Sequence, residues 1–256
     1  MPDLTYKDLS VPLPQPTQLL GRARELELIG RLLTEHGVRL LTITGPAGVG
    51  KTRLALEAGS RLSSVYTHGI VFVDLAPIRD SRLVLPAIAQ ALNLPEASNA
   101  APLDSICAYL QDRSTLLILD NFEQVLPASA QLCQILENCS GATLLVTSRW
   151  ALHLQWEHLV PVSPLQLPDL DHLPPAEELA EIPAVALFLE RARARRPDFT
   201  LDPSQARTLA ELCIRLDGLP LAIELAAARL DVLPLATIAQ RLDDRLRLLR
   251  SEALDL

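Results

Sequence analysis

Residues 45–52 read Gly-Pro-Ala-Gly-Val-Gly-Lys-Thr and fit the pattern G-x-x-x-x-G-K-[S/T]. The apolar run RLLTITG (39–45) comes directly before this stretch, and the helix-forming segment LALEAGSRLSS (54–64) follows it. A glycine-rich turn that matched the pattern by chance would lack this order of strand, loop and helix. The context therefore predicts a P-loop that binds a nucleoside triphosphate.

The residue types in this stretch suit phosphate chemistry. Glycines let successive backbone N–H groups point at phosphate oxygens, and the N-terminus of the following helix adds partial positive charge. We expect Lys51 to neutralise the β- and γ-phosphates and Thr52 to bind Mg²⁺ through its hydroxyl group. The predicted nucleotide-binding residues of the loop are Gly45, Pro46, Ala47, Gly48, Val49, Gly50, Lys51, Thr52 and Arg53.

Two further strand ends are candidates for the same site. Asp120 ends the apolar run LLILD (116–120), where the aspartate of a P-loop enzyme holds Mg²⁺. Capping of the next helix is the alternative for Asp120, and the P-loop upstream favours the metal role. Arg149 ends the run LLVTSR (144–149), and ligands of parallel sheets bind beyond such strand ends. There Arg149 can distinguish triphosphate from diphosphate, whereas an ion pair with a neighbouring acid is the alternative.

Short apolar runs alternate with helical segments over residues 19–163. The predicted strands are 39–45, 69–75, 114–120, 141–149 and 158–162. This alternation predicts an α/β fold, in which helices cover both faces of a five-stranded parallel sheet. We assign residues 19–163 to a P-loop nucleotide-binding domain.

The flanking segments differ in composition. Prolines at positions 2, 12, 14 and 16 predict an extended linker over residues 1–18. Residues 164–183 hold five prolines and five acidic residues, and we expect a linker over 164–182. Residues 183–256 are predicted as a small all-helical domain, in which Asp202-Pro203 begins one helix and Gly218-Leu219-Pro220 ends that helix and begins the next.

Composition limits the classes of function. The net charge of −8 disfavours general attraction to nucleic acid. The four cysteines form no C-x-x-C pair, so reduced thiols are expected rather than disulfides or a metal site. No apolar run approaches the roughly 18 residues that span a bilayer, and the first residues do not resemble a signal peptide. We therefore expect a cytoplasmic protein without membrane contact.

Several motifs together resemble one family of ATPases. In order along the chain, these are LLGRARELELIGRLL, GPAGVGKT, LLILDNFEQVL, LLVTSR and GLPLAIELAAARL. This series is similar to the STAND class of P-loop ATPases, in the NB-ARC-like branch, and the run LDNFEQVL is most like bacterial transcriptional regulators. The resemblance covers roughly residues 18–250, and the GLPL motif behind a P-loop is its most specific part.

The resemblance implies a nucleotide switch, closed with ADP and opened for oligomerisation by ATP. It implies the strand order 5-1-4-3-2 and partner domains elsewhere in a longer chain, namely a winged helix and sensor repeats. It also implies that Arg22 contacts the base or ribose and that Pro220 packs on adenine. From the residues alone, the better explanation of Pro220 is that it begins a helix.

The sequence departs from many relatives after Asp120. Asn121 stands where they carry a second acid that orients the attacking water, and asparagine is a weaker base. Glu123 is the alternative, although we expect its place on the next helix to limit its reach. We therefore expect slow hydrolysis, as the resemblance to a generally slow family also implies. An arginine supplied in trans can be worth ~10³–10⁵ in rate, and an isolated monomer would lack it.

Two other classes of function remain open. The arginines at 191, 193, 195 and 196 end a helix and are best explained by a solvated face and the helix dipole. They would also suit a contact with a partner or with DNA, or the lid of a small-molecule P-loop kinase. A scaffold that has lost nucleotide binding is the third class, and the complete P-loop argues against it.

Overall fold

The computed structural model describes residues 19–95 and 101–242, and it divides into two compact units at Val162 and Ser163. The first unit contains the P-loop, and the second contains the GLPL motif. The linker predicted over residues 1–18 lies outside the described residues.

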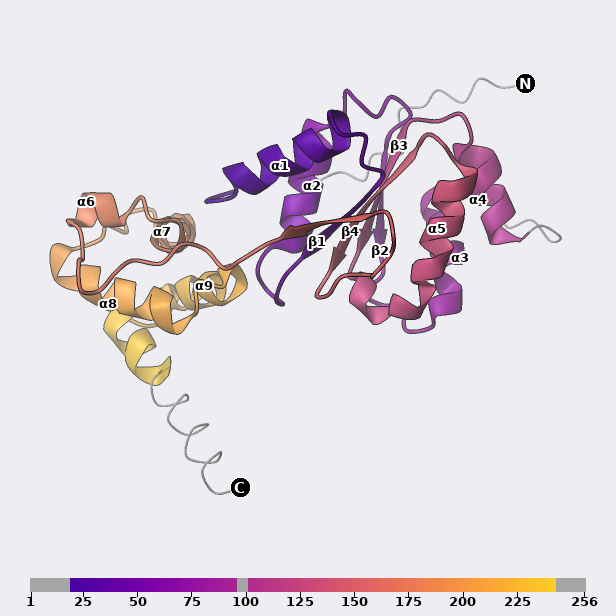
Figure 1. Ribbon diagram of the computed structural model, residues 1–256. Coiled ribbons are helices and arrows are strands. Elements are labelled where there is room, and N and C mark those ends of the chain that lie inside the picture. Colours follow the sequence, from indigo (N-terminus) through magenta and orange to yellow (C-terminus); the bar gives the residue numbers. More distant parts are fainter. Residues whose placement is uncertain (1–18, 96–100, 243–256) are drawn as a thin grey trace. The chain divides into compact units, whose positions relative to one another are not determined.

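The first unit is built on a sheet of five parallel strands (Figure 1). The strands are β1 (Leu40–Thr44), β2 (Ile70–Asp74), β3 (Thr115–Asp120), β4 (Ala142–Ser148) and β5 (Glu157–Pro161). Their order is β2-β3-β4-β1-β5, which is the predicted order 5-1-4-3-2 read from the other edge. This order places β4 between β1 and β3. Because the strands are parallel, the segments that follow these three strands lie side by side at the carboxyl ends of the strands.

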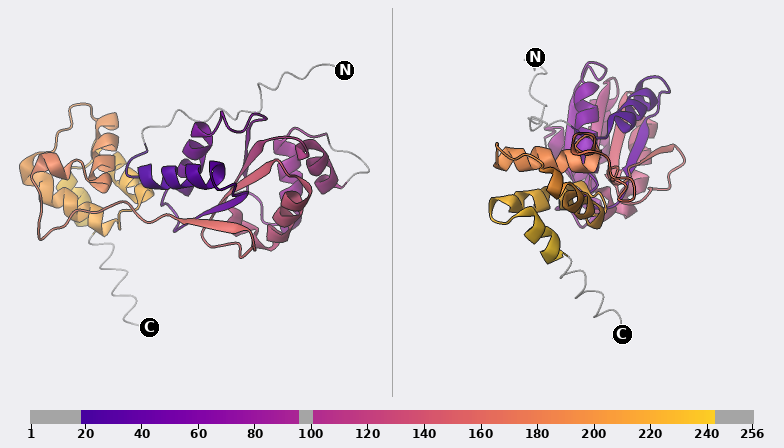
Figure 2. Two further views of the ribbon diagram at one scale, coloured as in Figure 1. Left: turned by 45° about the horizontal axis from the view of Figure 1, so that its top comes forward. Right: turned by 90° about the vertical axis from the view of Figure 1, so that its left-hand side faces the viewer.

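Helices cover both faces of this sheet, as the alternating pattern predicts (Figures 1 and 2). Helices α1 (Ala23–Thr34) and α2 (Lys51–Arg61) lie on one face, and α3 (Val84–Ala91), α4 (Pro102–Leu110) and α5 (Ser129–Asn138) lie on the other. Every residue of β3 and β4 is buried. Leu117, Leu119, Leu144 and Val146 belong to the core cluster that α3, α4 and α5 complete.

The segment after Asp120 departs from the predicted continuous helix. Two short 3₁₀ turns, η2 (Phe122–Gln124) and η3 (Leu126–Ala128), come before α5. Pro127 stands in the first turn of η3, where its missing N–H group costs no hydrogen bond. As a result Glu123 lies on a turn close to the strand end rather than on the long helix. A similar turn, η1 (Ser81–Leu83), comes before α3.

The first unit ends beside the start of the P-loop. The backbone N–H group of Val162 donates a hydrogen bond to the carbonyl oxygen of Thr44 at 2.7 Å. A Cβ atom at Gly45 would lie 2.5 Å from the carbonyl oxygen of Val162. Glycine is therefore required at Gly45 by the close approach of the chain as well as by phosphate chemistry.

The second unit is helical over residues 163–242, with no strand in that described range. Its elements are α6 (Ala176–Leu179), α7 (Pro183–Arg195), α8 (Pro203–Arg215), α9 (Pro220–Ala227) and η4 (Ala228–Asp231). Helix α7 packs against α8 and α9. A further helix begins at Leu235, and the part of it predicted beyond residue 242 lies outside the described residues. The carboxylate of Asp202 caps α8 by accepting from the N–H group of Ser204, as predicted.

The segment 164–182 is part of the second unit and contributes to its core. Leu165 and Leu179 are buried despite the many prolines and acids around them. The N–H group of Leu165 donates to the carbonyl oxygen of Gly218 at 2.9 Å. Gly218 has a φ of +62°, and a Cβ atom there would lie 2.5 Å from the carbonyl oxygen of Leu165. The glycine of the GLPL motif thus ends α8 and gives room to this segment.

Candidate functional site

The P-loop, residues 45–50, joins β1 to α2 at the carboxyl edge of the sheet. The φ angles of Gly45, Gly48 and Gly50 are 150°, 77° and 96°, so all three glycines are in conformations that other residues rarely adopt. Pro46 and Ala47 are exposed at the tip, and Val49 is buried beneath it. The predicted order of strand, loop and helix is confirmed.

Lys51 is held by the loop that it follows. Its Nζ atom donates hydrogen bonds to the carbonyl oxygens of Gly45 at 2.8 Å and Pro46 at 3.0 Å. Burial lowers the pKa of Lys51, while the charges of Glu123 and Asp120 act in the opposite direction and that of Arg149 adds to the lowering. A phosphate bound here would supply the negative charge that this buried ammonium group lacks.

The side chains of Thr52 and Asp120 meet beneath the loop. The hydroxyl group of Thr52 lies 2.8 and 3.0 Å from the two carboxylate oxygens of Asp120. Burial raises the pKa of Asp120, and the hydrogen bonds from Thr147 and Thr52 partly offset this rise. One hydroxyl and one carboxylate from neighbouring elements are the hard oxygen donors that Mg²⁺ prefers, so the residues fit this ion.

Thr147 is a member of this cluster that sequence reasoning did not single out. Its hydroxyl group donates to Asp120 Oδ1 at 2.5 Å and accepts from the N–H group of Asn121 at 3.0 Å. Asn121 has a φ of +62°, a left-handed conformation that asparagine tolerates. The predicted strand order could have pointed to Thr147, because it makes the ends of β3 and β4 neighbours.

Arg149 and Glu123 form an ion pair at the same edge. The Nε atom of Arg149 lies 3.2 Å from Glu123 Oε1. The side chain of Glu123 is only 6% exposed, whereas that of Arg149 is 47% exposed. The structure therefore contains the neighbouring acid that the alternative explanation of Arg149 requires, and it brings Glu123 closer to the P-loop than the sequence suggests.

The other predicted residues lie in two places. Arg22 is buried against the P-loop, where its guanidinium group donates to Glu25 Oε1 at 2.9 Å and to the carbonyl oxygen of Val49 at 3.2 Å. Arg53 lies in the first turn of α2. Pro220 is the first residue of α9 in the second unit. Contacts of Arg22 and Pro220 with a nucleotide base stay predictions.

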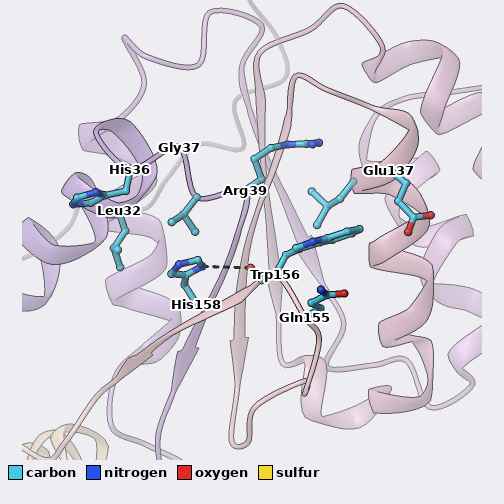
Figure 3. A pocket seen from close by; sticks show the side chains of 10 residues that line it. Leu32, His36, Gly37, Arg39, Glu137, Gln155, Trp156 and His158 are labelled. Atoms are coloured by element: carbon cyan, nitrogen blue, oxygen red, sulfur yellow. Dashed lines mark hydrogen bonds between the residues drawn. The ribbon is translucent and has the colours of Figure 1, made fainter.

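A separate cleft of about 870 Å³ lies at the amino ends of the strands, away from the P-loop (Figure 3). Its lining includes Arg39 just before β1, Trp156 just before β5, and His158 within β5. The ends of α1 and α5 complete it. Because ligands of parallel sheets bind at the carboxyl ends of the strands, this cleft is not the phosphate site.

Comparisons with known proteins agree with the geometry. Residues 34–154 match a family model described as an AAA domain. Rv0894, an uncharacterized protein of Mycobacterium tuberculosis, is 39% identical over 238 residues, which are 93% of this chain and 57% of that protein. Rv0890c, a candidate HTH-type transcriptional regulator of the same organism, is 39% identical over 212 residues, which are 82% of this chain and 22% of that protein.

The fold also occurs in the ORC2 protein of Aeropyrum pernix, solved as ADPNP and ADP complexes. That structure matches with a TM-score of 0.55 at 16% identity over 90% of this chain and 70% of that one. Together, the P-loop, the sheet order and the match of residues 34–154 to an AAA domain indicate a P-loop ATPase module. The chain spans about half or less of the length of both mycobacterial relatives. Within the described residues, no helix is long and apolar enough to cross a membrane.

Proposed function

We propose that this chain is the nucleotide switch of a larger signalling or transcription regulator. The observation that carries the proposal is the cluster of Lys51, Thr52 and Asp120 at the P-loop. The match to a candidate transcriptional regulator, of which this chain spans 22%, supports a module that acts on other domains. A winged helix and sensor repeats are the partners expected from the family resemblance.

The chemistry assigned to the cluster is binding and slow hydrolysis of ATP. Thr52 and Asp120 would hold Mg²⁺, which neutralises charge on the β- and γ-phosphates. Lys51 exchanges its bonds to Gly45 and Pro46 for bonds to phosphate oxygens. Lys51 therefore has hydrogen-bond partners both before and, in this proposal, after nucleotide binds.

In this proposal, residues outside the P-loop recognise the adenine base. Arg22 donates a hydrogen bond to the carbonyl oxygen of Val49 and, in this proposal, also contacts the base or ribose. Pro220 closes on the adenine from the second unit.

The switch needs more energy than one contact supplies. To move a closed population from 99:1 to 1:99, ATP must favour the open state by roughly 5.5 kcal/mol. A single bond from Arg149 to the γ-phosphate is worth about 1.5–3 kcal/mol. Contacts between copies of the protein in the ATP state are proposed to supply the remainder.

The rival proposal of a small-molecule kinase has less support. The lid it needs would come from the arginines that end α7. Arg191 instead pairs with Glu224 at 3.0 Å, and Arg195 lies 3.9 Å from Asp231. Both arginines therefore have partners inside the second unit, which favours the solvated helix face.

Calorimetry with ADP and ATP, each with and without Mg²⁺, tests the proposal. The parent chain is expected to bind both nucleotides, and Lys51→Ala to lose binding at least about tenfold. The chain has only one other lysine, so Lys7→Ala is the matched control. A parent that binds neither nucleotide would support the scaffold, and transfer of the γ-phosphate to a small acceptor would support the kinase. Light scattering in ADP and in a non-hydrolysable ATP analogue tests oligomerisation.

A further inference from the structure

Glu123 has an unusual environment for a carboxylate. Its side chain is 6% exposed, and one oxygen, Oε1, is bonded to Arg149. The other oxygen, Oε2, is buried and has no hydrogen-bond partner among the described residues. A buried carboxylate oxygen without a donor is costly, and such sites often reflect a function.

The position of Glu123 makes it a neighbour of the phosphate site. Of the charged groups around Lys51, Glu123 has the largest effect on the ammonium group, ahead of Asp120. Glu123 reaches this place because η2 begins directly after Asn121 in its left-handed conformation. The continuous helix expected from the sequence would have carried the side chain further from the strand end.

Asn121 is the rival group for orienting water. An amide accepts a hydrogen bond but takes up no proton at neutral pH, whereas a carboxylate can do both. The backbone N–H group of Asn121 is already bonded to Thr147, which ties this residue to the metal-binding end of β3.

We propose that Glu123 orients the attacking water during ATP hydrolysis, and that Arg149 holds Glu123 inactive until a γ-phosphate draws the arginine away. This inference rests on the proposed nucleotide function and adds its regulation. The pair is a contact that a phosphate can break, because the side chain of Arg149 is 47% exposed and open to a competing anion. With ADP, no γ-phosphate competes for Arg149, and Glu123 stays paired.

The chemical step balances within the site. The water oxygen forms a bond to the γ-phosphorus, and the bond from that phosphorus to the β,γ-bridging oxygen breaks. Glu123 accepts the proton of the water, and the products are ADP and inorganic phosphate. Departure of Arg149 frees Oε1 of Glu123 to orient the water and to accept its proton.

The first test is single-turnover hydrolysis of γ-labelled ATP by the whole chain with Mg²⁺. Glu123→Gln keeps the size of the side chain and is expected to slow hydrolysis about 100-fold or more, with ATP affinity within about fivefold of the parent. Asn121→Ala is expected to slow it far less. Equal rates in Glu123→Gln and the parent would overturn the proposal, as would a parent that binds ATP without hydrolysing it.

The second test does not depend on catalysis. The chain has two tryptophans, and Trp156 lies in the cleft at the amino ends of the strands (Figure 3). In a Trp156→Phe background, emission therefore comes from Trp150, the neighbour of Arg149. A non-hydrolysable ATP analogue, but not ADP, is expected to change this emission, and Glu123→Gln to reduce the difference between the two nucleotides. The same emission with ATP analogue and ADP in the parent would contradict the release of Arg149.

Failure of this inference can be separated from failure of the proposed function. If calorimetry detects neither ADP nor ATP binding by the parent, the nucleotide switch is wrong, and the role of Glu123 with it. If both nucleotides bind but the two tests fail, only the roles of Glu123 and Arg149 are wrong.

Discussion

The guanidinium group of Arg22 donates a hydrogen bond to the carbonyl oxygen of Val49, 27 residues later, at 3.2 Å. The same group pairs with Glu25 at 2.9 Å. Arg22 therefore fixes the buried side of the P-loop from the segment that leads into α1.

Arg22→Ala is expected to weaken ADP and ATP binding by similar factors, about 10- to 100-fold. The reason is that the loop loses a charged hydrogen bond worth about 1.5–3 kcal/mol. Arg24→Ala, on the exposed side of α1, is the control and should leave both affinities unchanged. Calorimetry of the two variants measures the effect. A loss confined to one of the nucleotides would contradict this role, because the loop holds phosphates common to both.

Lys51 offers a direct chemical measurement of occupancy. The chain has two lysines, Lys7 and Lys51, so an amine acylating reagent followed by mass spectrometry reports each one separately. Burial lowers the pKa of Lys51 and leaves more of it as the reactive neutral amine, and bound phosphate would reverse this. ADP or ATP is expected to slow acylation of Lys51 at least about fivefold and to leave Lys7 unchanged. Equal slowing at both lysines would point to a general effect of the nucleotide on the reagent.

Asp120→Asn is expected to separate stability from function. Burial raises the pKa of Asp120 above its ordinary value of 3.8. Between 3.8 and the raised pKa of the folded chain, Asp120 is protonated more in the folded chain than in the unfolded chain. The free energy of unfolding therefore falls as pH rises through this range. The variant lacks this fall and should melt at the same or a higher temperature than the parent at neutral pH, while it loses Mg²⁺-dependent nucleotide binding. Melting curves from about pH 4 to about pH 8 check the sign, and a lower melting temperature for the variant at neutral pH would refute it.

Gly218→Ala is expected to destabilise the second unit by about 1–3 kcal/mol. An alanine would have to keep the left-handed backbone conformation of Gly218, and its methyl group would clash with the carbonyl oxygen of Leu165. Gly30→Ala is the matched control, because a Cβ atom there meets nothing within 4 Å and lies inside α1. That control should gain about 0.5–1 kcal/mol. Chemical denaturation followed by circular dichroism measures both, and equal stability of Gly218→Ala and the parent would contradict the steric argument.

Much of the fold could be predicted because its signals are local. The apolar runs before Gly45 and Asp120 have the length and composition of buried strands, and the phosphate-binding loop carries its own glycine pattern. The strand order came from the family resemblance, and the structure confirms it. Asp202 capped α8 as expected, since a cap depends on residues only two positions away.

The features that could not be predicted depend on distant contacts. The 3₁₀ turns after Asn121 depend on a left-handed backbone, which sequence periodicity does not reveal. The pairing of Thr147 with Asp120 depends on the exact register of β3 and β4. Burial of Leu165 depends on the space left by Gly218, more than fifty residues later, and the prolines around Leu165 conceal it.

The close approach of Val162 to Gly45 gives the chain a mechanical property. Whatever follows Val162 is joined covalently to the residue whose N–H group is bonded to Thr44, one position before the phosphate-binding loop. Tension on the chain beyond residue 162 is therefore borne first by that hydrogen bond, and its rupture would leave the start of the loop without lateral support. If the proposed nucleotide switch is correct, force on the chain beyond residue 162 is expected to change the nucleotide residence time, which optical tweezers could measure.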